Sequence, residues 1–226
     1  MDITIIGLGG IGSILCERLA RFLNYSRDLR TSNITLVDGD EYEDKNYERQ
    51  EFQAIGNKAR TKSIDLKMQF PNLNFTTHEV FVTEAIAADI IKEGSVVLLC
   101  VDNHKTRMII SNYCKKLKNV TLISGGNDFI DGNVQIYVRR GGEDLSPDLC
   151  AYHPEIANPE DKLPSEMSCE ELSNSSPQLY FANLGAATLM CWAFYNVVVK
   201  EVTPIPSEVY FDISTMSVSC MVREVK

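Results

Sequence analysis

Glycines follow the first apolar run of the sequence at a spacing suited to binding phosphate. The chain opens MDITIIGLGGIGS, in which Gly7, Gly9 and Gly12 form the pattern G-x-G-x-x-G and Gly10 adds a fourth glycine. Such a loop brings the N–H groups of a helix N-terminus close to a phosphate or pyrophosphate. Apolar residues at helical spacing over residues 15–23 predict the helix that the motif needs. The pattern alone does not distinguish a dinucleotide from ATP.

A second set of polar side chains follows the next apolar run, ITLVD, which ends at Asp38. An acid in this position commonly binds ribose hydroxyls, and a loop-capping aspartate is the alternative. The polar cluster that comes next contains Asp40, Asn46, Arg49 and Gln50. The forked guanidinium of Arg49 suits a phosphate, and Lys58, in GNKA, offers a second cation. Two cations suit a triphosphate. On their spacing alone, however, Arg49 and Lys58 fit an exposed, solvated loop equally well.

Asp102 and Asn103 follow a third apolar run, SVVLLCVD. A carboxylate placed near phosphates is a natural Mg²⁺ ligand, since this ion prefers one or two carboxylates together with phosphate oxygens. A helix cap is the alternative interpretation of an Asp-Asn pair after a strand. Arg107, one turn into the following helix, is placed to brace this loop.

Alternating strands and helices must position these residues. Apolar patterns predict strands over residues 3–6, 34–38, 75–82, 95–102 and 120–124, and intervening helices over residues 58–69, 85–91 and 106–117. This β-α-β alternation predicts an α/β fold: a Rossmann-like, mostly parallel sheet with helices on both faces. Ligands of such sheets bind beyond the carboxyl ends of the strands, where Asp38 and Asp102 both fall.

The pattern changes after residue 130. Alternation over residues 133–140 predicts a half-exposed antiparallel strand, and a long helix is expected over residues 178–200. Between them, residues 141–177 show no periodicity and predict a long crossover loop, of a length that is usually functional or mobile. VYFDIS and SVSCMVRE predict a closing hairpin of antiparallel strands. We expect a single domain over residues 1–226.

Composition excludes several classes of function. The 226 residues carry a net charge of −9 without a basic stripe, so nucleic acid is not an expected partner. No apolar run approaches the roughly 20 residues of a membrane span, and the longest, over residues 185–199, carries Asn196 and predicts a core helix. The seven cysteines are scattered without a C-x-x-C pair, and Cys150-x-x-His153 supplies only two of four zinc ligands. With a first strand that starts at residue 2, we expect a cytoplasmic protein without zinc.

Five segments, in order, resemble the ThiF/MoeB/HesA superfamily, which includes the ubiquitin-activating enzymes and their bacterial relatives. They are GLGGIGS, DGDEYEDKNYERQ, GNKA, CVDNHKTR and ISGGNDFIDGNVQIYV. The D-x-D…N-x-x-R-Q and D-N-x-x-x-R blocks are not shared with dehydrogenases. The resemblance implies the adenylation fold and an enzyme that uses ATP to adenylate the C-terminal carboxylate of a ubiquitin-like, β-grasp protein ending in glycine, releasing pyrophosphate. The compact form is similar to small bacterial ThiF-like proteins encoded beside ubiquitin-like conjugation genes.

The resemblance also implies roles for single residues. It assigns ATP to Gly7, Gly9, Gly10 and Gly12, its ribose to Asp38, its phosphates to Arg49 and Lys58, support of that loop to Asn46 and Gln50, and Mg²⁺ to Asp102, with Asp40 and Asn103 completing the nucleotide site. Positioning and charge neutralisation then supply the catalysis, which accounts for a sequence without a Ser-His-Asp constellation.

Many members of the superfamily pass the acyl group on to a cysteine thiol. The resemblance implies Cys169, near the end of the expected crossover loop, with Cys150 as the alternative. Against this, Glu166, Glu170 and Glu171 would raise the pKa of a thiol at Cys169. The further partners implied are a second copy of the chain in a homodimer and a conjugating enzyme or sulfur acceptor.

Two other classes of protein remain as alternatives. An oxidoreductase that binds NAD or FAD explains the glycine loop and Asp38 but leaves Arg49, Lys58 and Asp102 without a role. A catalytically inactive scaffold that binds a ubiquitin-like protein has no need to keep Asp38, Arg49, Lys58 and Asp102 together.

Overall fold

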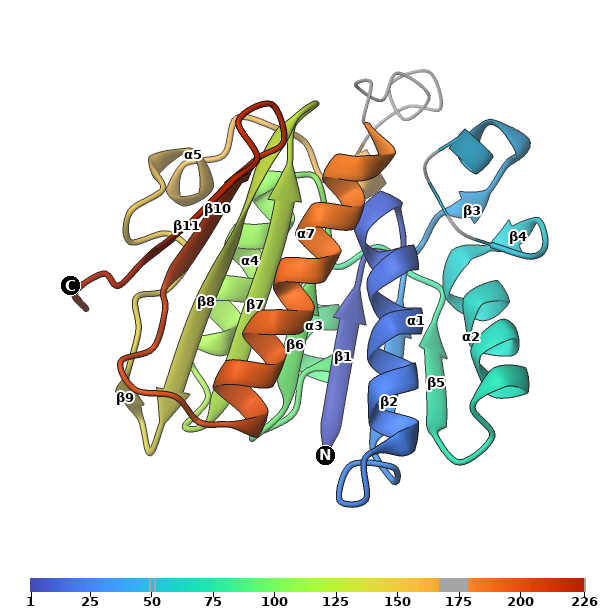
Figure 1. Ribbon diagram of the computed structural model, residues 1–226, viewed down its shortest axis with the longest axis horizontal. Helices are drawn as coiled ribbons and strands as arrows, with labels where there is room; N and C mark the ends of the chain where they lie inside the picture. The colour runs from blue at the N-terminus through green and yellow to red at the C-terminus, as the bar shows by residue number, and fades with distance from the viewer. Residues whose placement is uncertain (49, 51, 167–178, 226) are drawn as a thin grey trace.

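A nine-stranded sheet runs through the computed structural model, which describes residues 1–48, 50, 52–166 and 179–225 (Figure 1). Five strands pair in parallel: β1 (Asp2–Ile6), β2 (Asn33–Val37), β5 (Asn74–His78), β6 (Val96–Leu99) and β7 (Val120–Asn127). Four more pair antiparallel: β8 (Asp131–Arg140), β9 (Glu143–Asp144), β10 (Glu208–Asp212) and β11 (Ser217–Met221). The main order is β11-β10-β8-β7-β6-β1-β2-β5, which confirms the mostly parallel sheet with C-terminal antiparallel strands.

Helices cover both faces of this sheet, as the β-α-β pattern predicts. One face carries α1 (Gly10–Tyr25), α2 (Lys58–Gln69) and α7 (Tyr180–Ala193), and the other carries α3 (Glu84–Ile90), α4 (His104–Cys114) and α5 (Pro154–Ala157) (Figure 1). Alternate residues of each strand enter the two cores: Ile5 packs toward α1, whereas Ile6 packs toward α3 and α4. Because both faces are buried, the parallel strands need continuous apolar runs.

Strand β8 is buried, and the prediction that it is half-exposed is wrong. Val134, Ile136 and Val138 face the core beneath α7, while Tyr137 enters the core on the opposite side. The reason is its position: β8 lies between β7 and β10 inside the sheet, with a helix on one side and the α5 segment on the other. Even the polar Gln135 is only 3% exposed.

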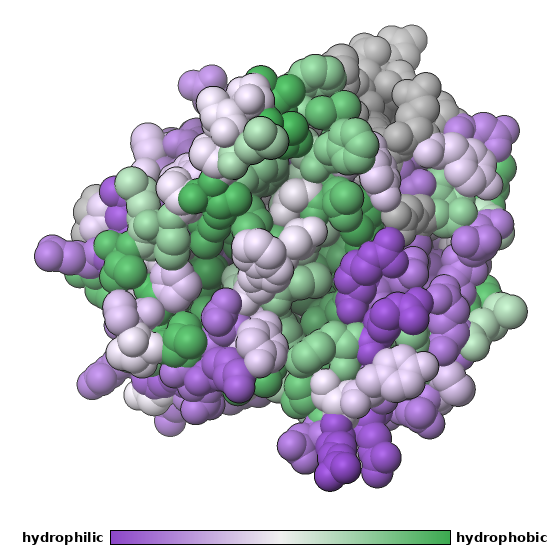
Figure 2. Space-filling model, in the orientation of Figure 1, coloured by the Kyte–Doolittle hydropathy of each residue, from purple (hydrophilic) through white to green (hydrophobic). Residues whose placement is uncertain are grey.

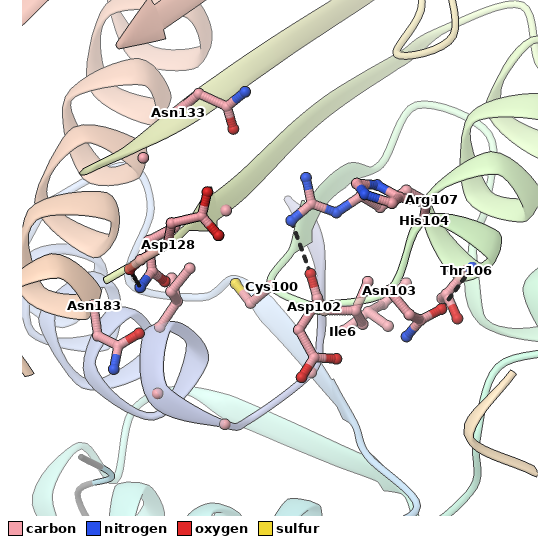
Figure 3. Close-up of a pocket in the computed structure, with 18 of the residues that line it drawn as sticks. Ile6, Cys100, Asp102, Asn103, His104, Thr106, Arg107, Asp128, Asn133 and Asn183 are labelled. Carbon is pink, nitrogen blue, oxygen red and sulfur yellow. Dashed lines mark hydrogen bonds between the residues drawn. The ribbon is translucent and has the colours of Figure 1, made fainter. Parts of the chain in front are cut away.

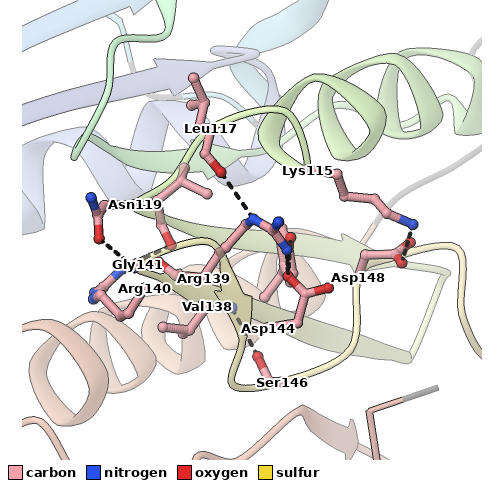
Figure 4. Close-up of polar contacts among 12 residues, drawn as sticks. Lys115, Leu117, Asn119, Val138, Arg139, Arg140, Gly141, Asp144, Ser146 and Asp148 are labelled. Atoms are coloured by element: carbon pink, nitrogen blue, oxygen red, sulfur yellow. Dashed lines mark hydrogen bonds and ion pairs between the residues drawn. The ribbon is translucent and has the colours of Figure 1, made fainter.

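The segment expected as an irregular crossover loop contains regular structure in its first two thirds. Besides β9 and α5 it forms a 3₁₀ turn, η2 (Pro164–Glu166), and Leu149, Ile156 and Leu163 are buried in the core. Figure 4 shows its start, where Asp144 pairs with Arg139 and Lys115 Nζ lies 2.8 Å from Asp148 Oδ2. These contacts join the segment to β8 and α4, and residues 167–178 lie outside the described part of the chain.

Helix α7 continues into a π-helical turn, η3 (Phe194–Val199). Together they form a 20-residue apolar helix, long enough to cross a membrane, so the expectation of no such run is wrong for this segment. Half of the helix is buried inside the protein, against α1 and the sheet, as a core helix would be. Its outer face exposes Phe181, Trp192 and Tyr195. Figure 2 views this face and shows apolar side chains over α7, bordered by hydrophilic ones over α1.

Candidate active site

One large cavity, of about 1020 Å³, opens at the carboxyl ends of the parallel strands. It brings together most of the residues singled out in the sequence: Gly7, Gly9, Gly10, Asp38, Asp40, Asn46, Gln50, Lys58, Asp102 and Asn103. Gly12 lies beneath the loop and does not line the cavity, while Arg49 and Cys169 fall outside the described residues. Four separate loops, after β1, β2, β6 and β7, therefore meet at one place, as parallel strands require.

The glycine loop is shaped by two close backbone contacts. Gly7 has φ +87°, and a Cβ on it would lie 2.9 Å from the Cys100 carbonyl. A Cβ on Gly12 would lie 1.9 Å from the Gly7 carbonyl oxygen, so only glycine lets α1 start this close to the loop. At Gly9, in contrast, a Cβ would meet nothing within 4 Å, because this residue faces the open cavity. The N-terminus of a 16-residue helix thus points at free space suited to an anion.

Asp38 ties the glycine loop to the turn after β2. Its Oδ2 accepts a hydrogen bond from the Leu8 N–H at 2.6 Å, and its Oδ1 accepts one from the Asp40 N–H at 2.9 Å. Burial raises the pKa of the Asp38 carboxyl, and the charge of nearby Lys58 opposes that rise. The carboxylate therefore caps a loop, as the alternative interpretation predicts, and at the same time lines the cavity.

Lys58 is buried at the start of α2, with 6% of its surface exposed. Its ammonium lies 2.5 Å from Asp40 Oδ2, and this ion pair holds the cation at the cavity wall. Lys62, one turn further along α2, lines a separate, smaller pocket with Asp65. Of these two lysines, only Lys58 lines the large cavity.

Asn57 fixes the position of this ion pair. Its Oδ1 caps α2 by accepting from the Arg60 N–H at 3.1 Å, and its Nδ2 donates to the carbonyls of Asp38 and Asp40 at 3.1 and 3.2 Å. One buried amide thereby joins the helix start to the acidic turn. Nearby, β3 (Glu41–Tyr42) and β4 (Gly56–Asn57) pair as a short antiparallel ribbon.

The loop between these two short strands includes the 3₁₀ turn η1 (Asp44–Glu48). Asn46 Oδ1 accepts from the Glu43 N–H at 2.9 Å, and the Asn46 carbonyl accepts from the Gln50 N–H at the same distance. Gln50 Oε1 is buried without a partner among the described atoms. Asn46 thus supports the loop, while Gln50 lines the cavity and keeps an acceptor available.

Asp102 stands exposed on the loop between β6 and α4 (Figure 3). Asn103 caps α4, with its Oδ1 accepting from the Thr106 N–H at 2.8 Å, as the alternative interpretation predicts. Arg107 braces the loop from behind: its Nη2 donates to the carbonyls of Val101 and Gly125, both at 3.0 Å. Burial lowers the pKa of Arg107, and the charge of Asp102 opposes this shift.

No group of three or more His, Cys, Asp or Glu side chains able to hold a metal ion occurs in the described part of the chain. Asp102 is instead an exposed carboxylate in the wall of the cavity that α1 faces. Such an arrangement fits Mg²⁺, which is typically held by one or two protein carboxylates and by the phosphates of its nucleotide.

The cavity extends beyond these loops along a face that the sequence analysis missed. Its floor, termed here the polar ledge, consists of Asp131, Asn133, Gln135, Tyr210, Asp212, Ser217 and Ser219. These residues belong to β8, β10 and β11, and their register places Asp131 opposite Asp212 and Asn133 opposite Tyr210. The available signal was the alternation of polar residues from Asp131 to Gln135.

The cysteines differ in their access to solvent. Cys16, Cys100 and Cys114 are buried, and burial raises the pKa of Cys114 to about 12. The half-buried Cys150 also has a raised pKa, first from burial and then from the charge of Asp148. Cys150 is therefore a poor thiolate at neutral pH.

The model of the ThiF family matches residues 1–222. The chain belongs to the ThiF family. Its relatives include ubiquitin-like modifier-activating enzyme 5 of Xenopus laevis, 30% identical over 150 residues, which cover 59% of this chain and 36% of the relative. Molybdopterin-synthase adenylyltransferase of Haemophilus influenzae is 30% identical over 137 residues, covering 59% of this chain and 53% of the relative.

Solved structures share the ThiF fold at low sequence identity. The structure of E. coli MccB with ATP matches with a TM-score of 0.73 and 16% identity, covering 98% of this chain and 63% of that chain. PaaA matches with a TM-score of 0.72 and 17% identity, covering 98% and 63% respectively. This ThiF-family chain spans about a third to a half of the two curated relatives named above.

Proposed function

We propose that this chain is an adenylyltransferase that uses Mg·ATP to activate the C-terminal carboxylate of a small ubiquitin-like protein. One observation carries the proposal: the N-terminus of α1, the Lys58 ammonium and the exposed carboxylate of Asp102 all face one cavity. A helix N-terminus and a cation favour phosphate, and a single carboxylate fits Mg²⁺. The adenylyltransferases among the chain's relatives support the same reaction class.

The protein contributes to this reaction by positioning the two substrates and by neutralising the negative charge of the phosphates. ATP supplies an electrophilic α-phosphorus and a pyrophosphate leaving group. A carboxylate oxygen of the substrate forms a bond to that phosphorus, the bond to the bridging oxygen breaks, and pyrophosphate leaves with the electron pair. Lys58 and the N-terminus of α1 would offset the negative charge of the phosphates, Asp102 would hold Mg²⁺, and Asp38 would bind the ribose. Arg49, outside the described residues, is proposed as the second phosphate cation.

The polar ledge offers a route for the substrate's C-terminal segment. It continues the cavity away from the glycine loop, across three strands whose polar side chains face the same space. Extended chain needs hydrogen-bonding groups along its length, which Asn133, Tyr210 and Ser219 can supply. We therefore place the tail of the ubiquitin-like protein on this ledge, with its last carboxylate toward α1.

Transfer of the acyl group to Cys169 is proposed as the following step. The thiolate attacks the acyl carbon, the bond from that carbon to the phosphate oxygen breaks, and AMP leaves. Cys150, the alternative, is disfavoured by its raised pKa. Cys169→Ala should keep pyrophosphate exchange and lose a reductant-sensitive adduct with the ubiquitin-like partner. An adduct that survives in this variant but is absent from Cys150→Ala would reverse the assignment.

A homodimer is proposed from the exposed face of α7, because Trp192 and Tyr195 present large aromatic surfaces to solvent. Trp192→Glu should shift the mass measured by light scattering from two chains to one. A wild-type particle of 25.4 kDa at high concentration would contradict the dimer.

Calorimetry with Mg·ATP and with NADH tests the proposed reaction class. We expect micromolar affinity for Mg·ATP that weakens when EDTA removes Mg²⁺, and no useful affinity for NADH. Asp102→Ala should abolish this dependence on Mg²⁺ and also ATP–pyrophosphate exchange with a β-grasp protein encoded nearby. Asp89→Ala, which removes an exposed carboxylate of α3 outside the cavity, is the matched control. Tight NADH binding without ATP binding would favour the oxidoreductase instead.

A further inference from the structure

Asn183 lies in the first turn of α7 and has no exposed surface, yet it lines the cavity (Figure 3). Neither its Oδ1 nor its Nδ2 has a hydrogen-bond partner among the described atoms. Buried amide groups are almost always paired, because an unpaired one has given up its bonds to water without replacement. An unpaired carboxamide that faces a cavity therefore indicates that a bound ligand supplies its hydrogen-bond partners.

The surroundings of Asn183 locate that ligand. A Cβ built on Gly10 would lie 2.4 Å from Asn183 Nδ2, so the amide rests directly against the start of α1. Two residues along α7, a Cβ on Gly185 would lie 3.0 Å from the ring of Phe211 on β10. The first turns of α7 thus touch both the glycine loop and the strands of the polar ledge. Asn183 therefore lines the cavity beside the start of α1, and Phe211 lines the same cavity.

The rest of α7 shows that this amide is an exception. Within Tyr180–Ala193 the other buried side chains are apolar, and Asn183 is the single polar one with no exposed surface. Packing alone would favour a residue such as leucine here, since burying an unpaired amide is unfavourable. A carboxamide is also neutral and carries both donors and an acceptor. It can therefore contact a carboxylate beside a phosphate without repelling either.

We propose that Asn183 binds the reacting carboxyl group of the substrate, donating from Nδ2 to an acyl oxygen beside the α-phosphate. This inference rests on the proposed function, because it requires an acyl group and a nucleotide in the same cavity. Asn183 then positions the carboxylate for attack, while the N-terminus of α1 and Lys58 act on the phosphates. An aspartate of the same shape would repel the carboxylate and remove the donor.

Two probes separate the acyl group from the nucleotide. ATP tests the nucleotide half alone, and 5′-O-(N-glycylsulfamoyl)adenosine, a stable mimic of glycyl adenylate, adds the acyl junction. The wild-type chain should bind both. Asn183→Ala should weaken binding of the mimic about ten-fold or more and leave ATP affinity within about two-fold, which corresponds to the loss of one hydrogen bond. Asn183→Asp should weaken the mimic further.

Asn196→Ala is the matched control, since Asn196 is an exposed asparagine of the same helical segment whose Nδ2 donates to the Trp192 carbonyl. Its affinities for both probes should equal those of wild type. Thermal melting supplies a second readout: removing an amide without partners should leave the Tm of the free protein unchanged or higher. Asn183→Ser serves the same purpose if the alanine variant does not fold.

Several results would overturn the assignment. Equal weakening of ATP and of the mimic would place Asn183 on the nucleotide, and unchanged affinity for both would leave it without a ligand role. A lower Tm with unchanged affinities would show a purely structural residue. Failure of the proposed function looks different, because the wild-type chain would then bind neither probe.

Discussion

Replacing Asn57 by alanine should destabilise the protein and disorganise the cavity wall at the same time. This buried amide makes three hydrogen bonds: it caps α2 through Arg60 and holds the carbonyls of Asp38 and Asp40. Lys58, the next residue, depends on the same turn, because its N–H donates to the Asp40 carbonyl and its ammonium pairs with the Asp40 carboxylate.

The size of the effect follows from these three bonds. Loss of an Asn N-cap costs about 1 kcal/mol. Each of the two neutral bonds to a carbonyl contributes about 1 kcal/mol, so Asn57→Ala should lose about 3 kcal/mol in all. In a domain of this size the loss corresponds to a fall in Tm of about 6–12 °C. Asn57→Ser keeps a capping oxygen but is too short to reach both carbonyls, and it should lose about 2 kcal/mol.

Urea unfolding followed by circular dichroism measures both variants against wild type. Calorimetry with Mg·ATP, carried out well below the Tm of the alanine variant, should show weaker binding in both, because Lys58 loses its fixed position. An alanine variant within about 0.5 kcal/mol of wild type would refute the reasoning. Equal stability of the serine and alanine variants would refute the role assigned to the cap.

Two further predictions concern charge. Burial raises the pKa of Glu208, but hydrogen bonds from Arg223 and His153 outweigh burial and hold this pKa below its usual value. The Glu208 carboxylate therefore stabilises the fold above about pH 4.3, and this contribution is lost as the pH falls through the lowered pKa. Wild-type stability, measured by urea unfolding, should therefore fall more steeply in acid than that of Glu208→Gln, and parallel curves would speak against it. Asp131→Asn should raise the Tm, because Asp131 and Asp212 face each other in register and like charges there destabilise a sheet. Added salt should narrow the difference in Tm between wild type and this variant, and a Tm that the substitution leaves unchanged would contradict the prediction.

The parallel half of the fold could be predicted because its strands are continuous apolar runs bounded by glycine or acid. The residues at which the strands begin and end were harder to predict. The expected strand over residues 95–102 shortens to Val96–Leu99, since the chain turns into the cavity as soon as the sheet pairing ends. Strand β8 was misjudged for a different reason. Alternation of polar residues indicates that one face is polar, but Gln135 is buried beneath the α5 segment, which the sequence shows only as an irregular loop.

The candidate site also contains residues that could be predicted from the sequence and residues that could not. Residues that directly follow parallel strands, such as Asp38 and Asp102, could be placed together, because the carboxyl ends of those strands share an edge. Asn183 could not be placed, since it comes from a helix some 170 residues further along than Gly10, with a contact that only tertiary packing creates. Lys58 was identified, but its pairing with Asp40 depends on the β3–β4 ribbon. Strands of two residues are too short to leave a recognisable pattern in the sequence.

The cavity is built from nearly the whole length of the chain, from Ile6 at the end of β1 to Ser219 in β11. During synthesis, the first strand and the glycine loop leave the ribosome long before the last hairpin exists. A nascent chain therefore has no complete binding site until β11 has emerged and paired with β10. A ligand that spans the complete cavity connects β1 with β11, and at a hundred times its Kd it would stabilise the folded state by about 2.7 kcal/mol. Binding would in this way protect the newly folded domain as a whole.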